Sequence, residues 1–359
     1  MNVNIEYREV KTSDIEEVIS FHNRLYNDKR TSEQWLWEYK SEYPDNYVFT
    51  VALDENRIIS TQGMLPIITV LKGKNLLCSK SENSLLDTDY RGKTIFHDLY
   101  EYAMDKCEKK GMRFVFGLTT AVKVMEKKLG FHVYVDAMYK LTTSLNFGAA
   151  QRDIFYSKRN IFKKIVKSML VSYQHITSSF KRRNIKSKSD NYSVKQKLID
   201  IKDMDIFYKH LRDQYPNLIH LYQDEIFMRW RIHNNPFIEY KTYFLYQGER
   251  LKAYCYFNSQ DRITAYLSDF TFEDTEAGIF LLEKIMTDLC KEKIAYISFV
   301  GNVKNDLINK TFKLLKKSGF TSSGFMPFII RNISFEDEDY LYDINNWYIN
   351  GLWTEGTTI

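Results

Sequence analysis

Two stretches far apart in this sequence share the same landmarks in the same order. Each has an acidic residue within its first two positions, then an aromatic residue, a Trp and, six or seven residues after that Trp, a Pro: SEQWLWEYKSEYP at 32–44 and DEIFMRWRIHNNP at 224–236. Each is followed by two strand-like runs, and each half ends in a helical pattern closed by Gly-Phe. This order predicts two copies of one unit. The alternative is ordinary α/β alternation, which would not by itself duplicate the Trp–Pro and Gly-Phe landmarks.

A chain of 359 residues is long enough for two domains with cores of their own. We expect an N-terminal domain at 1–147, a basic linker or insert at 148–197, a C-terminal domain at 198–335 and a tail at 336–359. The fold class expected is α/β (α+β), with a mixed, mostly antiparallel sheet flanked by helices in each unit. In the first unit, the pattern ends with a helix over residues 121–130 and a single last strand over residues 131–142.

Composition narrows the class of protein. The chain is 44% hydrophobic and 15% aromatic, which is typical of a globular protein. No apolar run approaches 18 residues, so we expect no membrane span, and the polar N-terminus does not look like a signal peptide. The four cysteines are scattered without a CxxC, which favours a reducing cytoplasm, and the histidines show no paired spacing that would predict a metal site.

The stretch DTDYRGKTIFHDLYEYA, residues 87–103, places a glycine loop between an apolar strand and a long helix. Gly92 allows a tight turn, and the first turn of the helix has free N–H groups. Arg91 and Lys93 add positive charge, although either side chain could simply be solvated. Together these features predict a binding site for an anion.

This order of strand, DYRGKTIF loop, helix, FVFGL strand, helix and KKLGF resembles the GNAT superfamily of acyl-CoA-dependent N-acyltransferases. The resemblance covers most of residues 1–145, with a weaker second copy at about 198–335. The tandem arrangement and the Trp–Pro opening are similar to GNAT proteins associated with bacterial surface-polysaccharide synthesis. The resemblance implies that acetyl-CoA is the acyl donor and that no metal is required.

The family's diphosphate loop reads Q/R-x-x-G-x-G/A and falls here on residues 89–94, where Gly92 matches while Asp89 and Thr94 depart from the pattern. The resemblance implies that the loop and helix start hold the CoA diphosphate, that one strand pairs with the pantetheine arm, and that two threonines reach it or cap the next helix. These cofactor-binding residues are Leu85, Leu86, Asp87, Arg91, Gly92, Lys93, Thr94, Ile95, Thr119 and Thr120.

At the corresponding loop of the second copy stand the carboxylates Glu273, Asp274 and Glu276. Like charges would repel a diphosphate, so we expect that the second unit has lost CoA binding and instead shapes the acceptor pocket. Beyond this, its charges suggest an ordinary solvated face.

Acyl transfer to an amine needs positioning, a proton acceptor, donors to the carbonyl oxygen and a proton for the leaving thiolate. By resemblance, the donor N–H lies near Leu86. Glu82 is the candidate base, the alternative being a solvent-facing residue of an alternating strand. Glu126 occupies the position of the family's acidic Tyr and could equally be an exposed helix residue, which leaves Tyr134 or Tyr139 as replacements.

Three further side chains have two interpretations each. His97 lies close to the loop and could touch the cofactor, although a surface helix position is the simpler expectation. Trp37 and Trp230 are expected as core anchors rather than as residues that stack on a ligand.

Residues 152–197 carry thirteen Lys and Arg against two Asp. Within them, RNIFKKIVKSMLVSYQHI (residues 159–176) has an apolar face flanked by lysines, which is typical of a basic amphipathic helix. It could contact an anionic membrane from the cytoplasmic side, or it could be a linker helix packed between the units. The following residues, 180–197, are polar and are expected to be mobile.

These observations favour a cytoplasmic acetyl-CoA-dependent N-acetyltransferase with a small amine acceptor, foremost an amino sugar or its nucleotide-linked form. We expect no specific nucleic-acid partner. One alternative is a Fem-like transferase that uses aminoacyl-tRNA, although the glycine loop and the lack of coiled-coil heptads count against it. Another is a non-catalytic module that binds acyl-CoA or a partner.

Overall fold

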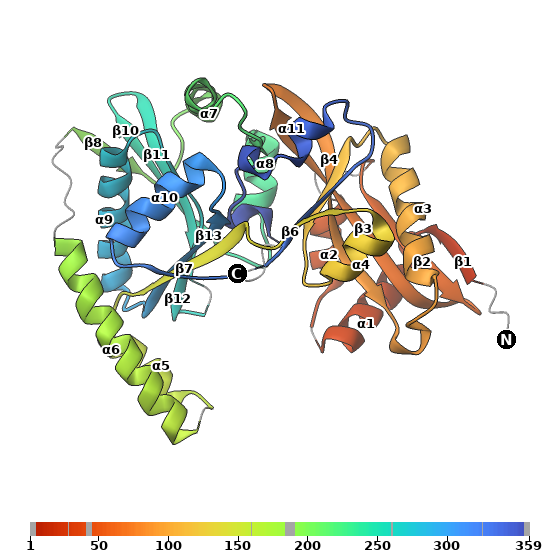
Figure 1. Cartoon of the computed structure of the whole chain (residues 1–359), viewed down its shortest axis with the longest axis horizontal. Helices are drawn as coiled ribbons and strands as arrows, with labels where there is room; N and C mark the ends of the chain where they lie inside the picture. The colour runs from red at the N-terminus through yellow and green to blue at the C-terminus, as the bar shows by residue number, and fades with distance from the viewer. Residues whose placement is uncertain are drawn as a thin grey trace.

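The computed structural model describes residues 5–27, 29–40, 45–158, 160–183, 191–259, 261–324 and 326–354. In these ranges the chain forms two units side by side, each built on one mixed sheet (Figure 1). No helix in them is long and apolar enough to cross a bilayer. All four cysteines are free thiols, of which Cys290 is exposed.

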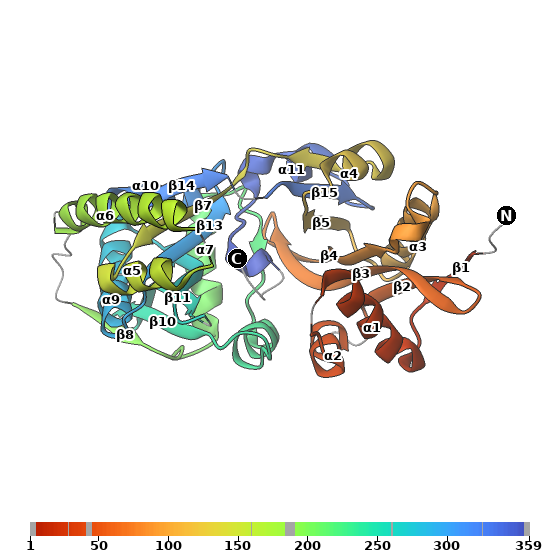
Figure 2. The same ribbon diagram turned by 90° about the horizontal axis from the view of Figure 1, so that it is seen from below.

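The first sheet has the strand order β1-β2-β3-β4-β5-β15-β6, and a short strand, β9, also pairs with β3. Helices α1 and α2 cover one face and α3 and α4 the other, as Figure 2 shows. Its strands are β1 (Ile5–Glu9), β2 (Val48–Asp54), β3 (Arg57–Leu71), β4 (Lys74–Leu86), β5 (Phe114–Leu118), β6 (His132–Tyr134), β9 (His220–Leu221) and β15 (Phe328–Asn332). Its helical elements are η1 (Thr12–Asp14), α1 (Ile15–Tyr26), α2 (Ser32–Lys40), η2 (Thr88–Tyr90), α3 (Ile95–Lys109) and α4 (Val122–Leu129).

The second sheet repeats this plan in the order β8-β10-β11-β12-β13-β7-β14. Its strands are β7 (Met138–Ser144), β8 (Tyr192–Lys195), β10 (Lys241–Gln247), β11 (Arg250–Asn258), β12 (Thr264–Phe272), β13 (Tyr296–Asn302) and β14 (Thr321–Gly324). The helical elements around it are α5 (Phe147–Tyr156), α6 (Ile161–Arg183), α7 (Lys202–Gln214), α8 (Glu225–Phe227), the π-helix η3 (Met228–His233), α9 (Thr275–Lys291), α10 (Asp306–Lys317), α11 (Glu338–Tyr342), η4 (Ile344–Asn346) and η5 (Gly351–Trp353).

Each unit contains one parallel strand pair, β4 with β5 and β12 with β13, and its other pairs are antiparallel. The two mixed sheets flanked by helices confirm the predicted fold class and the tandem plan.

The two sheets exchange one strand. β15, from the end of the chain, lies between β5 and β6 of the first sheet, and β7, from the first half, lies between β13 and β14 of the second. The prediction of one last strand over residues 131–142 was therefore wrong. The chain turns after Tyr134, so β6 and β7 belong to different sheets. Neither sheet is complete without a strand from the other half.

The matched tryptophans meet between the units. The Nε1–H of Trp37 donates to the carbonyl of Trp230 over 3.1 Å, and the Nε1–H of Trp230 donates to the carbonyl of Trp37 over 3.1 Å. Their ring centroids lie 5.7 Å apart, and the side chains are 7% and 2% exposed. This reciprocal contact relates the two copies, and it confirms the interpretation of both residues as core anchors.

The segment after α11 fills the second unit. In that unit β12 and β13 pair only from Thr264 to Leu267 and then diverge. Beyond this point the amide of Asn302 on β13 donates to the carbonyl of Ile349 over 3.0 Å, and the Tyr348 hydroxyl donates to Asp269 on β12 over 3.0 Å. The residues predicted as a tail are thus largely buried where the two strands separate.

The predicted basic helix is α6, which packs through one face on α5 and β7 at the edge of the second unit (Figure 1). It is not packed between the two units, so the linker interpretation was wrong. The expectation of a mobile segment over residues 180–197 was also wrong in part, because α6 continues to Arg183 and β8 completes the second sheet at Tyr192–Lys195. Residues 184–190 lie outside the described residues.

Candidate acyl-CoA and acceptor site

The loop before α3 presents a row of free amides. Gly92 adopts φ +86°, and a Cβ there would meet nothing within 4 Å. The amide of Asp98 is the first on α3 to find a helical acceptor, the carbonyl of Thr94. In the described part of the chain, the amides from Gly92 to His97 donate to no acceptor. Consecutive unpaired N–H groups at a helix N-terminus form a binding site for an anion such as a diphosphate.

Cations surround this loop. Arg91 and Lys93 are exposed, which agrees with either interpretation of these side chains. Sequence reasoning missed Arg24 on α1 and Arg57 at the start of β3, which lie 3.0 Å and 4.0 Å from the Asp87 carboxylate. No local motif marks them, because both come from elements distant in sequence. Although burial opposes its charge, the hydrogen bond from Arg24 lowers the pKa of Asp87.

A further carboxylate, that of Asp98, lies near these cations at the start of α3. Asp98, in the first turn of α3, accepts a hydrogen bond from the Thr94 hydroxyl over 2.7 Å. Thr94 stands where the family pattern has Gly or Ala, and its hydroxyl is thus hydrogen-bonded within the first turn of α3. The Asp87 carboxylate accepts from the amide of Asp89 over 3.3 Å. The side chains of Asp87 and Thr94 thus form hydrogen bonds within the loop without occupying the amides from Gly92 to His97.

Strand β4 separates from β5 just before the loop. The two strands pair only at Ser79 and Lys80, opposite Val115 and Phe116. The amide of Asp87 donates to the carbonyl of Ile59 on the β3 side. Because alternate amides of a strand point to opposite sides, the amide of Leu86 points to the side that β5 has left.

A bulge at Asn83, which has φ +51°, shifts the register between β3 and β4. Unpaired backbone groups on this part of β4 can pair with an extended ligand. Across the opening, the Thr119 hydroxyl accepts from the amide of Ala121 over 3.1 Å, and Thr120 is exposed. Ala121 is the N-cap residue of α4, and no side chain caps this helix, so the capping interpretation of the two threonines was wrong.

Glu82 is buried on β4 and is only 4% exposed, so the interpretation as a solvent-facing residue was wrong. Its carboxylate forms an ion pair with Lys80, which is 3% exposed and lies two residues earlier on the same face of the strand. Opposite Glu82 in the register stands Gly63, where a Cβ would come within 2.2 Å of the Tyr39 hydroxyl. Gly63 therefore lets Tyr39 lie against the strand beside Glu82.

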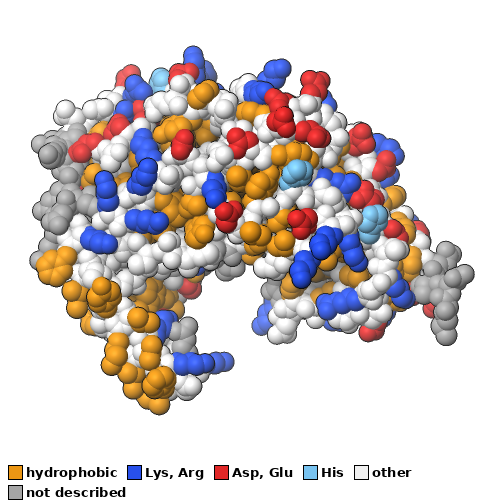
Figure 3. Space-filling model, viewed as in Figure 1, with side chains coloured by type: hydrophobic (Ala, Val, Ile, Leu, Met, Phe, Trp, Pro, Cys, Tyr) orange, Lys and Arg blue, Asp and Glu red, His pale blue; other side chains and the backbone are white. Residues whose placement is uncertain are grey.

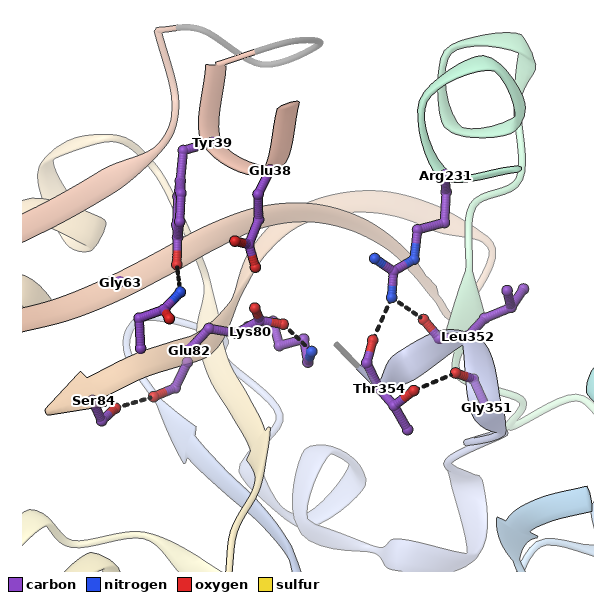
Figure 4. A network of polar contacts seen from close by, with 12 residues as sticks. Glu38, Tyr39, Gly63, Lys80, Glu82, Ser84, Arg231, Gly351, Leu352 and Thr354 are labelled. Atoms are coloured by element: carbon purple, nitrogen blue, oxygen red, sulfur yellow. Dashed lines mark hydrogen bonds and ion pairs between the residues drawn. The ribbon is translucent and has the colours of Figure 1, made fainter. Parts of the chain in front are cut away.

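A second buried ion pair faces the first. Glu38 on α2 pairs with Arg30, and Arg30 donates to Asn83 over 2.7 Å. Asn83 in turn donates to the Tyr39 hydroxyl over 2.6 Å. Figure 4 shows the Glu38, Lys80 and Glu82 side chains directed toward one another.

From the second unit, Arg231 of η3 lies across from these side chains (Figure 4). It donates to the carbonyls of Leu352 and Thr354. None of Lys80, Glu38 or Arg231 was predicted as a site residue. Glu38 and Lys80 come from different elements of the first unit, and only the packing of the two units places Arg231 near them.

The comparisons with known proteins agree with this geometry. Residues 6–133 match the family described as an acetyltransferase (GNAT) domain. The first unit is a GNAT acetyltransferase domain. The GNAT fold uses acyl-CoA. The family match and the fold together support the assignment of this protein as an acyltransferase.

Solved structures share the fold across both units. A protein of unknown function and probable N-acyltransferase from Enterococcus faecalis V583 aligns with TM-score 0.65 and 10% identity, over 92% of this chain and 73% of that one. A tandem GNAT protein from the clavulanic acid biosynthesis pathway aligns with TM-score 0.55 and 10% identity, over 93% of this chain and 100% of that one. N-myristoyltransferase from Saccharomyces cerevisiae aligns with TM-score 0.56 and 11% identity, over 97% and 86%. No curated protein sequence matches this chain.

The remaining candidates of the GNAT domain lie apart from Glu82. Tyr134 lies on β6, two strands beyond β5, so it is about 15 Å from β4 at the usual strand spacing. Its hydroxyl donates to the carbonyl of Tyr342 over 2.5 Å, and burial raises its pKa to about 12. Tyr139 lies in the second sheet, and Glu126 is exposed on α4 as expected for an ordinary helix residue. His97 is a half-exposed residue of α3 beside Asp98.

Among its described residues, the second unit has no comparable loop. The Asp274 carboxylate caps α9 by accepting from the amide of Ala277 over 2.9 Å. Glu273 is 5% exposed and pairs with Arg250 and Lys252, so the expectation of a solvated face was wrong here. With its helix start capped and its strand opening filled by the segment around Ile349, this unit lacks both features that the first unit offers a cofactor.

Proposed function

We propose that the protein is an acetyl-CoA-dependent N-acetyltransferase acting on a small amine. The observation that carries this proposal is the combination of free amides from Gly92 to His97 with the unpaired edge of β4 beyond Lys80. The amides would hold the diphosphate of CoA, and the β4 edge would pair with its pantetheine arm. The thioester would then lie near Leu86, at the point where β4 and β5 separate.

In this arrangement the neutral amine attacks the thioester carbonyl, a C–N bond forms and the C–S bond breaks. The amide of Leu86 would donate to the oxyanion, and Glu82 would take the proton that the amine loses. The thiolate must gain a proton as it leaves. Tyr134 stays a prediction for this role, and its hydrogen bond to Tyr342 and its distance from β4 do not favour it.

Calorimetry of acetyl-CoA binding to the intact protein and to Gly92→Glu tests the cofactor site. We expect one site per chain, lost in the variant, because a carboxylate side chain at the loop would repel the diphosphate. Two sites would contradict the assignment to the first unit alone. No binding to the intact protein would refute the proposal and favour an aminoacyl-tRNA donor or a non-catalytic module.

Glu82→Gln tests the base. Removing a general base costs roughly 10²–10⁴-fold in rate, so we expect a loss in kcat of that size with an unchanged dissociation constant for acetyl-CoA. Thiol release from acetyl-CoA with a panel of amines provides the measurement. Unchanged turnover in Glu82→Gln would exclude this residue as the base.

For the acceptor, we propose an amino sugar or its nucleotide-linked form, and through it a role in polysaccharide synthesis. The support is the resemblance to tandem GNAT proteins of that kind. Glucosamine and nucleotide-linked amino sugars, compared with aliphatic amines in the same assay, test this. Equal rates for all amines would contradict it.

We further propose a cytoplasmic protein that contacts anionic membranes through α5 and α6. Apolar side chains cover one side of these helices, as Figure 3 shows at the lower left. Those more than 40% exposed are Phe147, Phe155, Tyr156, Ile161, Phe162, Ile165, Val166, Met169, Leu170, Tyr173, Ile176 and Phe180. Arg152, Lys158 and Lys163 are exposed near them, and a basic amphipathic surface of this kind suits an interface with anionic lipid. Because α6 lies on the side of the second unit away from the GNAT domain, the contact would anchor the protein without lining its site.

Sedimentation with vesicles of phosphatidylglycerol and phosphatidylcholine tests this contact. Phe162→Glu should weaken binding by about tenfold or more, because burial of one such side chain contributes about 1.5–3 kcal/mol. Ile206→Glu, at an isolated apolar residue of α7 that is 51% exposed, is the matched control. Equal binding by both variants, or concentration-dependent dimerisation without vesicle binding, would overturn the membrane assignment.

A further inference from the structure

Glu38 and Arg231 occupy equivalent places in the two copies. Each follows directly after the tryptophan of its unit, and the tryptophans form the reciprocal contact that relates the copies. Equivalent positions beside such a contact lie on opposite sides of it. Here one copy contributes a carboxylate, which is directed toward Lys80 and Glu82, and the other contributes a guanidinium, which lies on the opposite side beside Leu352 and Thr354 (Figure 4).

Arg231 is only 4% exposed, yet its charge has no anionic partner in the described part of the chain. Its two hydrogen bonds come from one nitrogen, Nη2, which donates to the carbonyls of Leu352 and Thr354. The N–H groups of Nε and Nη1 have no acceptor among the described residues. A guanidinium carries five N–H donors and a full positive charge. Burying such a group without an anionic partner is unfavourable.

The other cations of this region differ from Arg231 in this respect. Arg30 pairs with Glu38, and Lys80 pairs with Glu82. The buried carboxylates of Glu38 and Glu82 thus each have a cationic partner from the first unit. Arg231 therefore adds a positive charge that no described residue balances, on the side of the region that the second unit provides.

We propose that Arg231 binds an anionic group of the acceptor, a carboxylate or a phosphate, while the acceptor's amine lies toward Glu82. This inference rests on the proposed function, because it assigns the acceptor to the same site. It narrows the acceptor class to amines that carry a negative charge, as a phosphorylated or nucleotide-linked amino sugar does and a free amino sugar does not. It also gives the second unit a direct part in recognition, since Arg231 comes from η3.

The test compares matched acceptors in the intact protein with acetyl-CoA. Glucosamine against glucosamine 6-phosphate examines the phosphate, and butylamine against 4-aminobutanoate examines the carboxylate. We expect the wild-type protein to prefer the anionic member of at least one pair. Arg231→Met should lower kcat/KM for that member by about 30-fold or more, mainly through KM, and should leave the neutral member unchanged. Arg231→Lys should recover part of the loss, and Arg229→Gln, at an exposed arginine of η3, is the control.

Two results would overturn the inference. One is a wild-type preference for the neutral acceptors. The other is an equal loss for all acceptors together with a lower melting temperature in Arg231→Met, which would show that Arg231 only anchors the backbone of Leu352 and Thr354.

Calorimetry with the same anionic amines, on the protein loaded with CoA, keeps this test separate from the proposed function. Binding that Arg231→Met abolishes, without turnover, would leave the anion site standing while the proposed acetyl transfer fails. No binding and no turnover with either anionic amine would refute the anion site as well.

Discussion

The reciprocal hydrogen bonds between Trp37 and Trp230 allow a quantitative test of how strongly the two units depend on each other. In Trp37→Phe the carbonyl of Trp230 loses its indole donor. A buried group left unsatisfied costs about 1–3 kcal/mol, and the smaller ring loses about 1 kcal/mol more of apolar burial. The sum is about 2–4 kcal/mol for this variant, and a similar value is expected for Trp230→Phe because the contact is symmetric.

This free energy translates into a small but measurable change in melting temperature. An unfolding entropy of about 2.1 cal/mol/K per residue over 359 residues gives roughly 0.75 kcal/mol/K if both units unfold together. Each variant should therefore melt about 3–5 °C lower, in a single transition that calorimetry can follow. A larger shift confined to one of two resolved transitions would mean that the units unfold separately.

Trp35→Phe is the matched control. Trp35 is 1% exposed, two residues before Trp37, and its Nε1–H has no hydrogen-bond partner in the described residues. The same change of ring should thus cost only about 1 kcal/mol of burial, a shift of about 1–2 °C. If Trp35→Phe destabilised the protein as much as Trp37→Phe, the hydrogen bonds would not be the source of the effect and the reasoning would be refuted.

Two further predictions concern single sites. Burial raises the pKa of Asp269 despite hydrogen bonds from Thr271, Tyr254 and others, so the folded state holds this proton more tightly than the unfolded chain. The stability that protonated Asp269 contributes is therefore present below about pH 4 and is lost as the pH rises toward the folded pKa. In urea titrations, the difference in unfolding free energy between wild type and Asp269→Asn should shrink over that rise. A difference that grows with pH would contradict the raised pKa. Gly63→Ala should displace Tyr39, break its hydrogen bond to Asn83 and lower kcat by about tenfold or more, whereas Gly324→Ala, where a Cβ meets nothing within 4 Å, should have no effect. Equal turnover in both glycine variants would show that the Tyr39 contact does not support the site.

Local features were predictable because local residues determine them. The loop at Gly92, the helix that follows it and the order of strands are encoded by glycine, by apolar periodicity and by capping chemistry within short windows. The divergence of β4 from β5 was expected only through the family resemblance, since its cause is pairing with distant strands. The sequence therefore predicted the loop and helix start of the candidate site better than the side chains around Glu82.

The sequence could not show which strands and side chains from distant parts of the chain contact each other in the folded protein. β7 and β15 are both short strands, and nothing in the local pattern of either one specifies the sheet in which it pairs. Their exchange is decided by the turn after Tyr134 and by the packing of the two units. Arg231 and Glu38 each follow a landmark tryptophan, but their placement around one region depends on the contact between Trp37 and Trp230, which are 193 residues apart.

The strand exchange also sets an order of events during synthesis. β6 ends at Tyr134, but β15, which separates it from β5, begins at Phe328. At about 5–20 residues per second, the ribosome needs roughly 10–40 s to make the intervening chain. For that time the GNAT domain, whose Gly92 loop is already made, carries an unpaired edge on β5 that can pair with other chains. A stop codon after residue 320 would thus remove the strand between β5 and β6 from the first sheet, although the codons for residues 1–134 would be unchanged.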